Sequence, residues 1–242
     1  EWNFNPIQKY SAKNPIENTR LLRVAQLQKV LKEMGEPVNK DAWAMGPLTI
    51  NAYYSPTENK FVMPMGILQF PFFDSNGSLY ENLGAVGAVM GHELGHGIDD
   101  QGSKFDEKGK LNQWMSMKDL AEFQKRGERM VNQFEKIGHN GKLTLGENVA
   151  DLVGLSFAYQ AAFGDKQGNK EEKQKFFIAY ARTWCEVARP GVIEKKLKTD
   201  PHALGWARIN EQVKHQPGFQ EAFSCKAGQP MTLSDSERIS IW

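Results

Sequence analysis

The sequence contains a His-Glu-x-x-His motif at residues 92–96, and this motif can bind a metal ion. In a helix, His92 and His96 lie four residues apart on one face, so both imidazoles can reach the same ion. Zinc accepts histidine nitrogens at about 2.0–2.1 Å. Glu93 stands beside the first histidine, where its carboxylate can act on a zinc-bound water rather than on the metal. The motif therefore predicts a hydrolytic zinc centre.

The residues that precede the motif predict the helix that would position it. The segment 83–90 contains only small and apolar residues and no proline, which is typical of a helix inside a core. The alternative is an exposed helix on which two histidines and a glutamate have no function. The composition argues against this alternative, because the solvated face of a helix is rich in polar residues.

A catalytic zinc ion needs a third protein ligand and one open position for water. The best candidate is Glu147, which opens an otherwise apolar segment, because metal binding removes the cost of burying its carboxylate. Asp151 lies four residues later on the same helix face, so one carboxylate can bind zinc while the other accepts a hydrogen bond from a ligand histidine. The alternative is a capping Glu147 and a surface Asp151. A metzincin ligand set is excluded, because Asp99 and Gly102 stand where that pattern requires glycine and a third histidine.

The bulk composition is that of an ordinary globular chain and narrows the range of partners. The 242 residues, 40% hydrophobic and 24% charged, suffice for one large domain or two small ones. Because 30 basic and 29 acidic residues leave a net charge of +1, we expect no binding to nucleic acid or to an anionic membrane surface. The most apolar uncharged stretch, 61–73, is shorter than the roughly 20 residues that cross a bilayer.

Two further features concern the ends of the chain and its thiols. The chain begins with Glu1 rather than methionine and carries no signal peptide, so we interpret it as a processed chain or a piece of a longer one. Cys185 and Cys225 are its two cysteines, and neither stands near the histidine motif. Two cysteines cannot form a zinc ribbon, which leaves buried free thiols or disulfide use as the alternatives.

Hydrophobic spacing and turn residues predict a mainly helical chain with one short β element. Two extended segments, 47–55 and 60–64, flank a polar turn and are expected to form a hairpin. The last twenty residues are expected to be irregular. Helices are expected over six ranges: 16–34, a motif helix that contains 83–96 and ends near 97–102, 116–136, 144–163, 171–189 and 201–213.

The histidine motif and the segment Gly-Glu-Asn-Val-Ala-Asp (146–151) together resemble the arrangement of the gluzincin zinc peptidases. Around them, the stretches Asn-Ala-Tyr-Tyr (51–54), Met-Gly-Ile-Leu-Gln-Phe-Pro-Phe-Phe (65–73) and Gly-Ser-Lys-Phe-Asp (102–106) are similar to those of the neprilysin family of zinc endopeptidases. The segment Asp-Asp-Gln-Gly-Ser-Lys-Phe (99–105) resembles the bacterial oligopeptidase branch of this family. The resemblance begins at about residue 35 and continues to the last residue. It implies an α+β, mainly α fold, namely a thermolysin-like (gluzincin) catalytic lobe with a small β element.

The resemblance implies roles for the residues of the two motifs. His92, His96 and Glu147 would be the ligands of one zinc ion (Zn²⁺) per chain. Glu93 would be the general base that activates water. Asp151 would orient a ligand histidine. These roles agree with the chemistry that the spacing of the residues allows.

The resemblance also implies a cleft that binds peptides. Asn51 and Ala52 correspond to a strand segment that hydrogen-bonds the backbone of a bound peptide. His202 corresponds to a histidine that stabilises the oxyanion and Arg208 to an arginine that holds a substrate carbonyl; taken alone, both would be ordinary surface residues. Three apolar residues correspond to the pocket for the residue after the scissile bond, or else belong to a plain core: Phe72, Val89 and Trp184.

Members of the family are much longer than this chain, which resembles only their carboxyl-terminal, catalytic part. We therefore interpret residues 1–242 as the carboxyl-terminal catalytic domain of a longer metallopeptidase, without the upstream helical lobe that covers the active site. Cys185 and Cys225 correspond to family cysteines that bond to upstream partners, so we expect no bond between them. Ile239 stands where animal members have the cysteine of a terminal Cys-x-x-Trp.

The leading hypothesis is a zinc endopeptidase that hydrolyses oligopeptides on the amino side of large apolar residues. The resemblance implies a location outside the cytoplasm. A second hypothesis is a zinc-bound domain that binds peptide, or nothing, without turnover. A third is a helical interaction domain that binds no zinc. Peptide hydrolysis with and without a chelator, together with the zinc content, distinguishes the three.

If the chain is a catalytic domain separated from its upstream lobe, we expect the chain to associate with copies of itself. Helix faces that pack against an upstream lobe would leave an apolar patch larger than the few hundred Å² usual for monomers. We expect light scattering to give a mass above that of one chain, and peptide turnover to be lower than that of the full-length parent. A strictly monomeric chain with the parent's turnover would contradict this interpretation.

Overall fold

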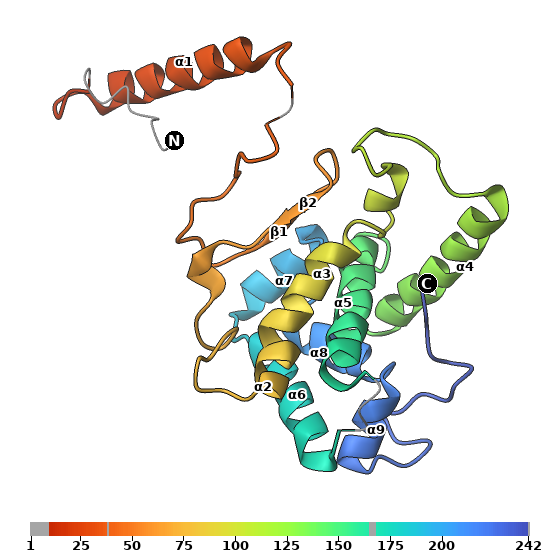
Figure 1. The fold of residues 1–242 in the computed structure, drawn as a ribbon. Coiled ribbons are helices and arrows are strands. Elements are labelled where there is room, and N and C mark those ends of the chain that lie inside the picture. Colours follow the sequence, from red (N-terminus) through yellow and green to blue (C-terminus); the bar gives the residue numbers. More distant parts are fainter. Residues whose placement is uncertain (1–9, 38, 165–167, 242) are drawn as a thin grey trace. The chain divides into compact units, whose positions relative to one another are not determined.

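The computed structural model describes residues 10–37, 39–164 and 168–241 (Figure 1). It divides the chain into two compact units, Glu1–Ala42 and Trp43–Trp242. The predicted metal-binding and substrate-binding residues all belong to the second unit. Each unit is therefore described by itself.

The first unit contains helix α1, Pro15–Glu33, as the hydrophobic spacing predicted. The side chain of Asn14 accepts a hydrogen bond from the backbone N–H of Glu17, and this capping bond explains where the helix begins. Gly35 has a φ of +87°, a left-handed conformation that suits the residue after a helix. No residue of α1 is buried within its unit.

The second unit is mainly helical, which confirms the predicted fold class. Its helices are α2 Leu79–Asn82, α3 Ala88–Gly95, α4 Met117–Lys136, α5 Leu145–Phe163, α6 Lys170–Thr183, α7 Pro190–Thr199, α8 Gly205–Val213 and α9 Pro217–Phe223. A π-helical turn, Leu83–Gly87, joins α2 to α3. Throughout the described ranges, no helix combines the length and the apolar composition that a membrane span needs.

The predicted hairpin forms a small antiparallel sheet. Strand β1, Tyr53–Ser55, pairs with β2, Lys60–Val62, so that Tyr53 lies opposite Val62 and Ser55 opposite Lys60. Both strands are shorter than the extended segments that the sequence predicted. The sheet is important for the site because the segment that carries Asn51 and Ala52 leads directly into β1.

Helices α3 and α5 lie side by side and touch through their backbones (Figure 1). A Cβ atom on Gly91 would lie 2.6 Å from the carbonyl oxygen of Gly154, and one on Gly154 would lie 2.4 Å from the backbone nitrogen of His92. A Cβ on Gly95 would lie 2.9 Å from the Cα of Ala150. Only glycine permits so close an approach. This contact brings the histidine motif of α3 against the start of α5.

Two apolar clusters pack helices α4, α6, α8 and α9 around this pair. In the first, the rings of Phe176 and Phe177, neighbours on α6, meet edge to face with centroids 5.1 Å apart, and Phe177 meets Phe219 of α9 in the same way at 5.4 Å. In the second, the fully buried Met130 and Phe134 of α4 pack against residues of α5, α8 and the C-terminal tail. The two clusters fix α5 from several directions.

The helix predicted over 171–189 is shorter in the structure, since α6 ends at Thr183. Pro190 begins a separate helix, α7, that the sequence analysis did not assign. A residue before proline avoids the helical region, and Arg189 accordingly has an extended backbone with ψ of 149°. The apolar spacing of α6 therefore continued in the sequence beyond the point where the backbone leaves the helix.

The helix predicted over 201–213 begins later, at Gly205. Oδ1 of Asp200 accepts a hydrogen bond from the backbone N–H of His202, and this local turn competes with a helix. Helix α9 was also not predicted; it begins at Pro217, a residue that suits a first helical turn. The chain beyond α9 is irregular, as expected.

The close contact of α3 with α5 predicts that Gly154→Ala is destabilising, because the added Cβ would meet the backbone of His92. Overpacking of this kind costs about 1–3 kcal/mol. The matched control is Gly127→Ala, also within a helix, where the added Cβ would lie 3.8 Å from the Leu145 side chain. We expect Gly154→Ala to lower the free energy of unfolding and to weaken zinc binding, and Gly127→Ala to change neither. Equal denaturation curves and zinc titrations for the two variants would contradict a backbone contact.

Candidate metal centre

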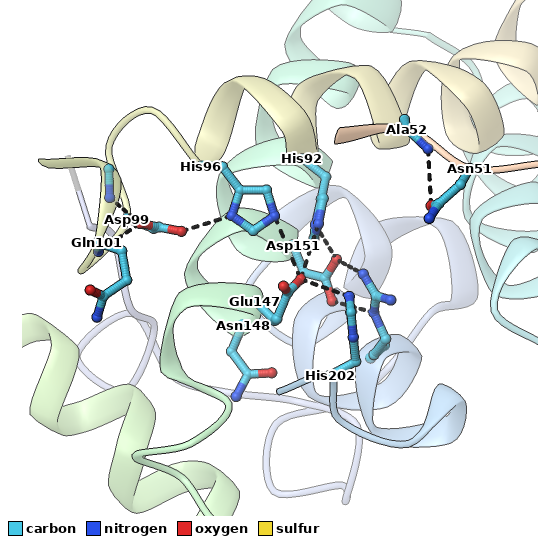
Figure 2. A network of polar contacts seen from close by, with 12 residues as sticks. Asn51, Ala52, His92, His96, Asp99, Gln101, Glu147, Asn148, Asp151 and His202 are labelled. Atoms are coloured by element: carbon cyan, nitrogen blue, oxygen red, sulfur yellow. Dashed lines mark hydrogen bonds and ion pairs between the residues drawn. The ribbon is translucent and has the colours of Figure 1, made fainter. Parts of the chain in front are cut away.

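His92 of α3, His96 at the C-terminal cap of the same helix and Glu147 of α5 converge on one point (Figure 2). Oε2 of Glu147 lies 3.2 Å from Nε2 of His92 and 3.6 Å from Nε2 of His96. The donor atoms of the three side chains all lie within 4.8 Å of one another. Within the described residues, this is the one such group of three or more histidine, cysteine or acidic side chains. It has the donor set of a catalytic zinc site with two histidines and one carboxylate.

Each of the two histidines is oriented by a carboxylate on its other nitrogen. Nδ1 of His92 lies 2.8 Å from Oδ1 of Asp151, and Nδ1 of His96 lies 2.7 Å from Oδ2 of Asp99. These bonds place the proton on Nδ1 and leave Nε2 as the electron-pair donor that a metal needs. Both rings are therefore aimed for metal binding.

Asp99 is a site residue that the sequence analysis did not assign. Its Oδ1 accepts hydrogen bonds from the backbone N–H groups of Gln101 and Gly102, at 2.8 and 2.7 Å, which leaves Oδ2 for His96 (Figure 2). The available signal was an acidic residue three positions after His96. Because α3 ends at Gly95, helical spacing alone does not bring the side chains of His96 and Asp99 together.

Asp151 is shared between the metal group and Arg208. The guanidinium donates from Nε to Oδ2 of Asp151 at 2.8 Å and from Nη2 to Oδ1 at 2.7 Å. The central carbon of the Arg208 guanidinium also lies 3.6 Å from the ring centroid of Trp184, which is a cation–π contact. Arg208 is thus buried and fully oriented, not the surface charge that the sequence left as the alternative.

The electrostatic balance of the group favours a bound cation. Burial opposes the charge on Asp151, but Arg208 and His92 hold the pKa of that carboxyl well below its usual range. Burial likewise opposes a charged His92, yet Asp151 and Glu147 raise the pKa of its ring to about 9. The negative charge that surrounds the ring is the charge that a metal dication neutralises.

Glu147 supplies the structural test of the metal assignment. Its Oε2 is buried and makes no hydrogen bond, although imidazole nitrogens of His92, His96 and His202 lie 3.2, 3.6 and 3.2 Å away. A buried carboxylate oxygen without a hydrogen-bond partner is costly unless a cation receives it. The residues present therefore fit a zinc ion.

His202 approaches this group from the segment before α8 (Figure 2). Its Nε2 lies 3.2 Å from Oε2 of Glu147, while its Nδ1 lies 2.9 Å from Oδ1 of Asp200. The ring remains half-exposed. The structure thus brings His202 to the metal group and leaves it accessible from solvent.

Glu93 follows His92 directly in α3 and, like His92 and His96, lines a cleft at the protein surface. Its side chain is buried, and burial raises the pKa of Glu93 although the neighbouring histidines partly offset this effect. A carboxylate with a raised pKa accepts a proton more readily, which suits a general base.

A cleft of about 710 Å³ joins the metal group to the predicted peptide-binding residues. Asn51 and Ala52 lie on its wall, where the side-chain oxygen of Asn51 accepts a hydrogen bond from the N–H of Ala52 at 2.9 Å (Figure 2). The cleft is also lined by the three residues of the predicted apolar pocket: Phe72, Val89 and Trp184. These three pack together with buried neighbours, so they are core residues that also border the cleft.

The sequence profile of peptidase family M13 matches residues 51–239. Neprilysin-3 of Drosophila melanogaster is 37% identical over 242 residues, which cover 93% of this chain and 30% of the relative. The neutral endopeptidase of Lactobacillus helveticus is 38% identical over 231 residues, which cover 93% of this chain and 35% of the relative. The chain thus spans about a third of the length of these relatives.

Solved structures show the same similarity. The crystal structure of PEPO from Lactobacillus rhamnosis HN001 matches with a TM-score of 0.89 and 32% identity, covering 96% of this chain and 38% of that one. The Mycobacterium tuberculosis zinc metalloprotease Zmp1, in complex with an inhibitor, matches with a TM-score of 0.85 and 33% identity, covering 95% and 38%. The fold and the His-His-Glu group are those of the metallopeptidase class. The chain belongs to peptidase family M13, which confirms the resemblance to the neprilysin family.

The contact between Asp99 and His96 predicts that Asp99→Asn weakens zinc binding. The amide keeps the oxygen that accepts from the backbone, but its NH₂ group would donate to Nδ1 and favour the proton on Nε2. Loss of such an orienting carboxylate typically costs about 10–100-fold in metal affinity. Titration against a chromophoric chelator measures this affinity, with the exposed Asp235→Asn as the control. Equal affinities of both variants would show that Asp99 does not orient His96.

Proposed function

We propose that this chain is the carboxyl-terminal catalytic domain of a zinc endopeptidase that hydrolyses oligopeptides on the amino side of large apolar residues. The observation that carries the proposal is the convergence of His92, His96 and Glu147 beside Glu93 in one cleft. Membership of family M13 supports it independently of the geometry.

His92, His96 and Glu147 would hold the zinc ion. When bound, zinc would polarise the scissile carbonyl and lower the pKa of a coordinated water. Glu93 takes the proton of the attacking water and delivers it to the leaving amine. The buried position of Glu93 supports this role, because burial raises the pKa of its carboxyl.

His202 and Arg208 would stabilise the charge that develops on the carbonyl oxygen. His202 lies close to the metal group, since its Nε2 is 3.2 Å from Oε2 of Glu147. The bonds from Arg208 to Asp151 use Nε and Nη2, which leaves Nη1 as a donor for a substrate carbonyl. Asp151 would therefore orient both a metal ligand and a substrate-binding group.

The preference for large apolar residues rests on the apolar part of the cleft. Phe72, Val89 and Trp184 would receive the side chain that follows the scissile bond, while Asn51 and Ala52 would hydrogen-bond the peptide backbone. A pocket of this kind gains affinity from the apolar area that the substrate side chain buries. Peptide libraries that vary this one position test the preference.

Similarity to the longer relatives extends the proposal to the whole protein. We propose that a further helical lobe covers the cleft and restricts it to oligopeptides, and that the enzyme acts outside the cytoplasm. Cleavage of short peptides but not of folded proteins, measured with the full-length protein, tests the first point. Cell fractionation of the source organism tests the second.

The proposal as a whole is tested by hydrolysis of a quenched fluorescent peptide. Activity should require one zinc ion per chain, disappear with a chelator and return when zinc is added. Stoichiometric zinc without hydrolysis would instead support a domain that binds peptide or nothing. A chain that takes up no zinc would exclude both.

The role of Glu93 predicts that Glu93→Gln keeps zinc but loses activity. The amide has nearly the same shape but cannot accept the proton, so turnover should fall at least about a hundredfold. Zinc content by atomic absorption should stay at the wild-type level. The exposed Glu128→Gln on α4 is the control and should leave both quantities unchanged. Substantial turnover by Glu93→Gln would mean that another group activates the water.

A further inference from the structure

The segment 200–204 links α7 to α8 and carries His202. Within it, Oδ1 of Asp200 accepts from the backbone N–H of His202 and lies 2.9 Å from Nδ1 of its ring. These bonds shape the segment internally. They do not fix it to the rest of the molecule, so the position of His202 depends on further contacts.

The segment ends at a helix start that lacks an ordinary cap. The first N–H groups of a helix have no partner within the helix and are usually satisfied by a polar side chain at the preceding residue. In α8 that residue is Leu204, whose side chain cannot accept a hydrogen bond. The acceptors come from other parts of the chain. Nε2 of His139 accepts a hydrogen bond from the backbone N–H of Leu204 at 3.1 Å, and Oε1 of Glu186 accepts one from the backbone N–H of Gly205 at 2.8 Å.

His139 comes from the connection between α4 and α5, well before Glu147 in the sequence. Its ring is buried between two aromatic rings, with centroids 6.1 Å from Phe134 and 5.5 Å from Trp206. Burial lowers the pKa of His139, which favours the neutral ring, whose Nε2 can accept a hydrogen bond. The acceptor is thus held rigidly by packing on both sides.

Glu186 comes from the connection between α6 and α7, two residues after Trp184. Its Oε2 accepts from Nζ of Lys196 at 2.7 Å, which orients the carboxylate toward Gly205. Gly205 has little space there, because an added Cβ would lie 2.1 Å from the carbonyl oxygen of Trp184. The start of α8 is therefore held tightly against the backbone of a residue that lines the cleft.

We propose that His139 and Glu186 are positioning residues that clamp the start of α8 and thereby hold His202 and Arg208 in the cleft. His202 stands two residues before Leu204, and the carbonyl oxygen of Leu204 accepts the backbone N–H of Arg208 at 3.0 Å. A shift of Leu204 moves both groups relative to Glu147. The inference rests on the proposed peptidase function only for its effect on turnover.

The clamp predicts a loss of turnover in variants that lack its acceptors. His139→Leu and Glu186→Met keep the approximate volume but remove the acceptor, so we expect kcat to fall about 10–100-fold with little change in zinc affinity. His139→Gln restores an acceptor oxygen near the position of Nε2 and should recover most of the activity. The matched control is Glu194→Met, which removes a glutamate that pairs with Lys198 within α7. Equal kcat values for all these variants would overturn the proposal.

A double-mutant cycle separates positioning from a general loss of stability. If His139 acts through His202, then His139→Leu should change kcat much less in a His202→Ala background than in the wild type. A merely structural defect would lower kcat by the same factor in both backgrounds. Equal factors would therefore contradict a positioning role.

Amide hydrogen exchange tests the clamp without reference to activity. The N–H groups of Leu204 and Gly205 should lose protection in His139→Leu and Glu186→Met respectively, while amides of α5 keep theirs. If the wild-type chain binds zinc but hydrolyses no peptide, the proposed function fails and this measurement still decides the clamp. Unchanged protection of both amides in the variants would show that the clamp does not exist.

Discussion

The direct backbone contact between α3 and α5 is the constraint on which the site depends. Gly91, Gly95 and Gly154 leave no side chain between the two helices, so the distance between their axes is set by backbone atoms alone. Side chains that leave the two helices at the edge of this contact must meet, and these are the histidines of one helix and the carboxylates of the other. Apolar packing around α5 then keeps the contact closed, because both clusters press on the same helix.

Charge is distributed around this contact so that Asp99, Asp151 and Arg208 all have buried or partly buried polar partners. Asp99 and Asp151 each accept from one histidine, and Arg208 neutralises the second side of Asp151. Oε2 of Glu147 remains without a hydrogen bond, at the point where the histidine nitrogens converge. Buried charge is tolerated only when it is paired, so a carboxylate oxygen that faces three imidazole nitrogens without a hydrogen bond fits the position of a cation. The geometry, the electrostatics and the family membership lead to the same kind of site.

The sequence predicted the parts of this site that depend on local spacing. The histidine motif, Glu147 and Asp151 follow from helical periodicity and from the cost of burying a carboxylate, and the fold class follows from the apolar patterns. The sequence did not predict Asp99, because its contact with His96 crosses a helix end. It also extended α6 beyond Thr183, missed the separate helix that begins at Pro190, and placed the start of α8 too early, where the turn at Asp200 competes with a helix. Each of these points depends on a local turn, helix end or proline that hydrophobic periodicity does not describe.

The double use of Asp151 limits how such a site can change over generations. One carboxylate contacts His92 with one oxygen and shares both oxygens with Arg208, which lines the cleft. With the roles proposed above for His92 and Arg208, a substitution that changes peptide recognition at Arg208 also alters the basicity of His92, and with it the retention of the metal. The two properties cannot drift separately. Lineages that exchange Arg208 are expected to exchange Asp151 as well, and laboratory selection for new peptide preferences should succeed sooner at the apolar wall of the cleft.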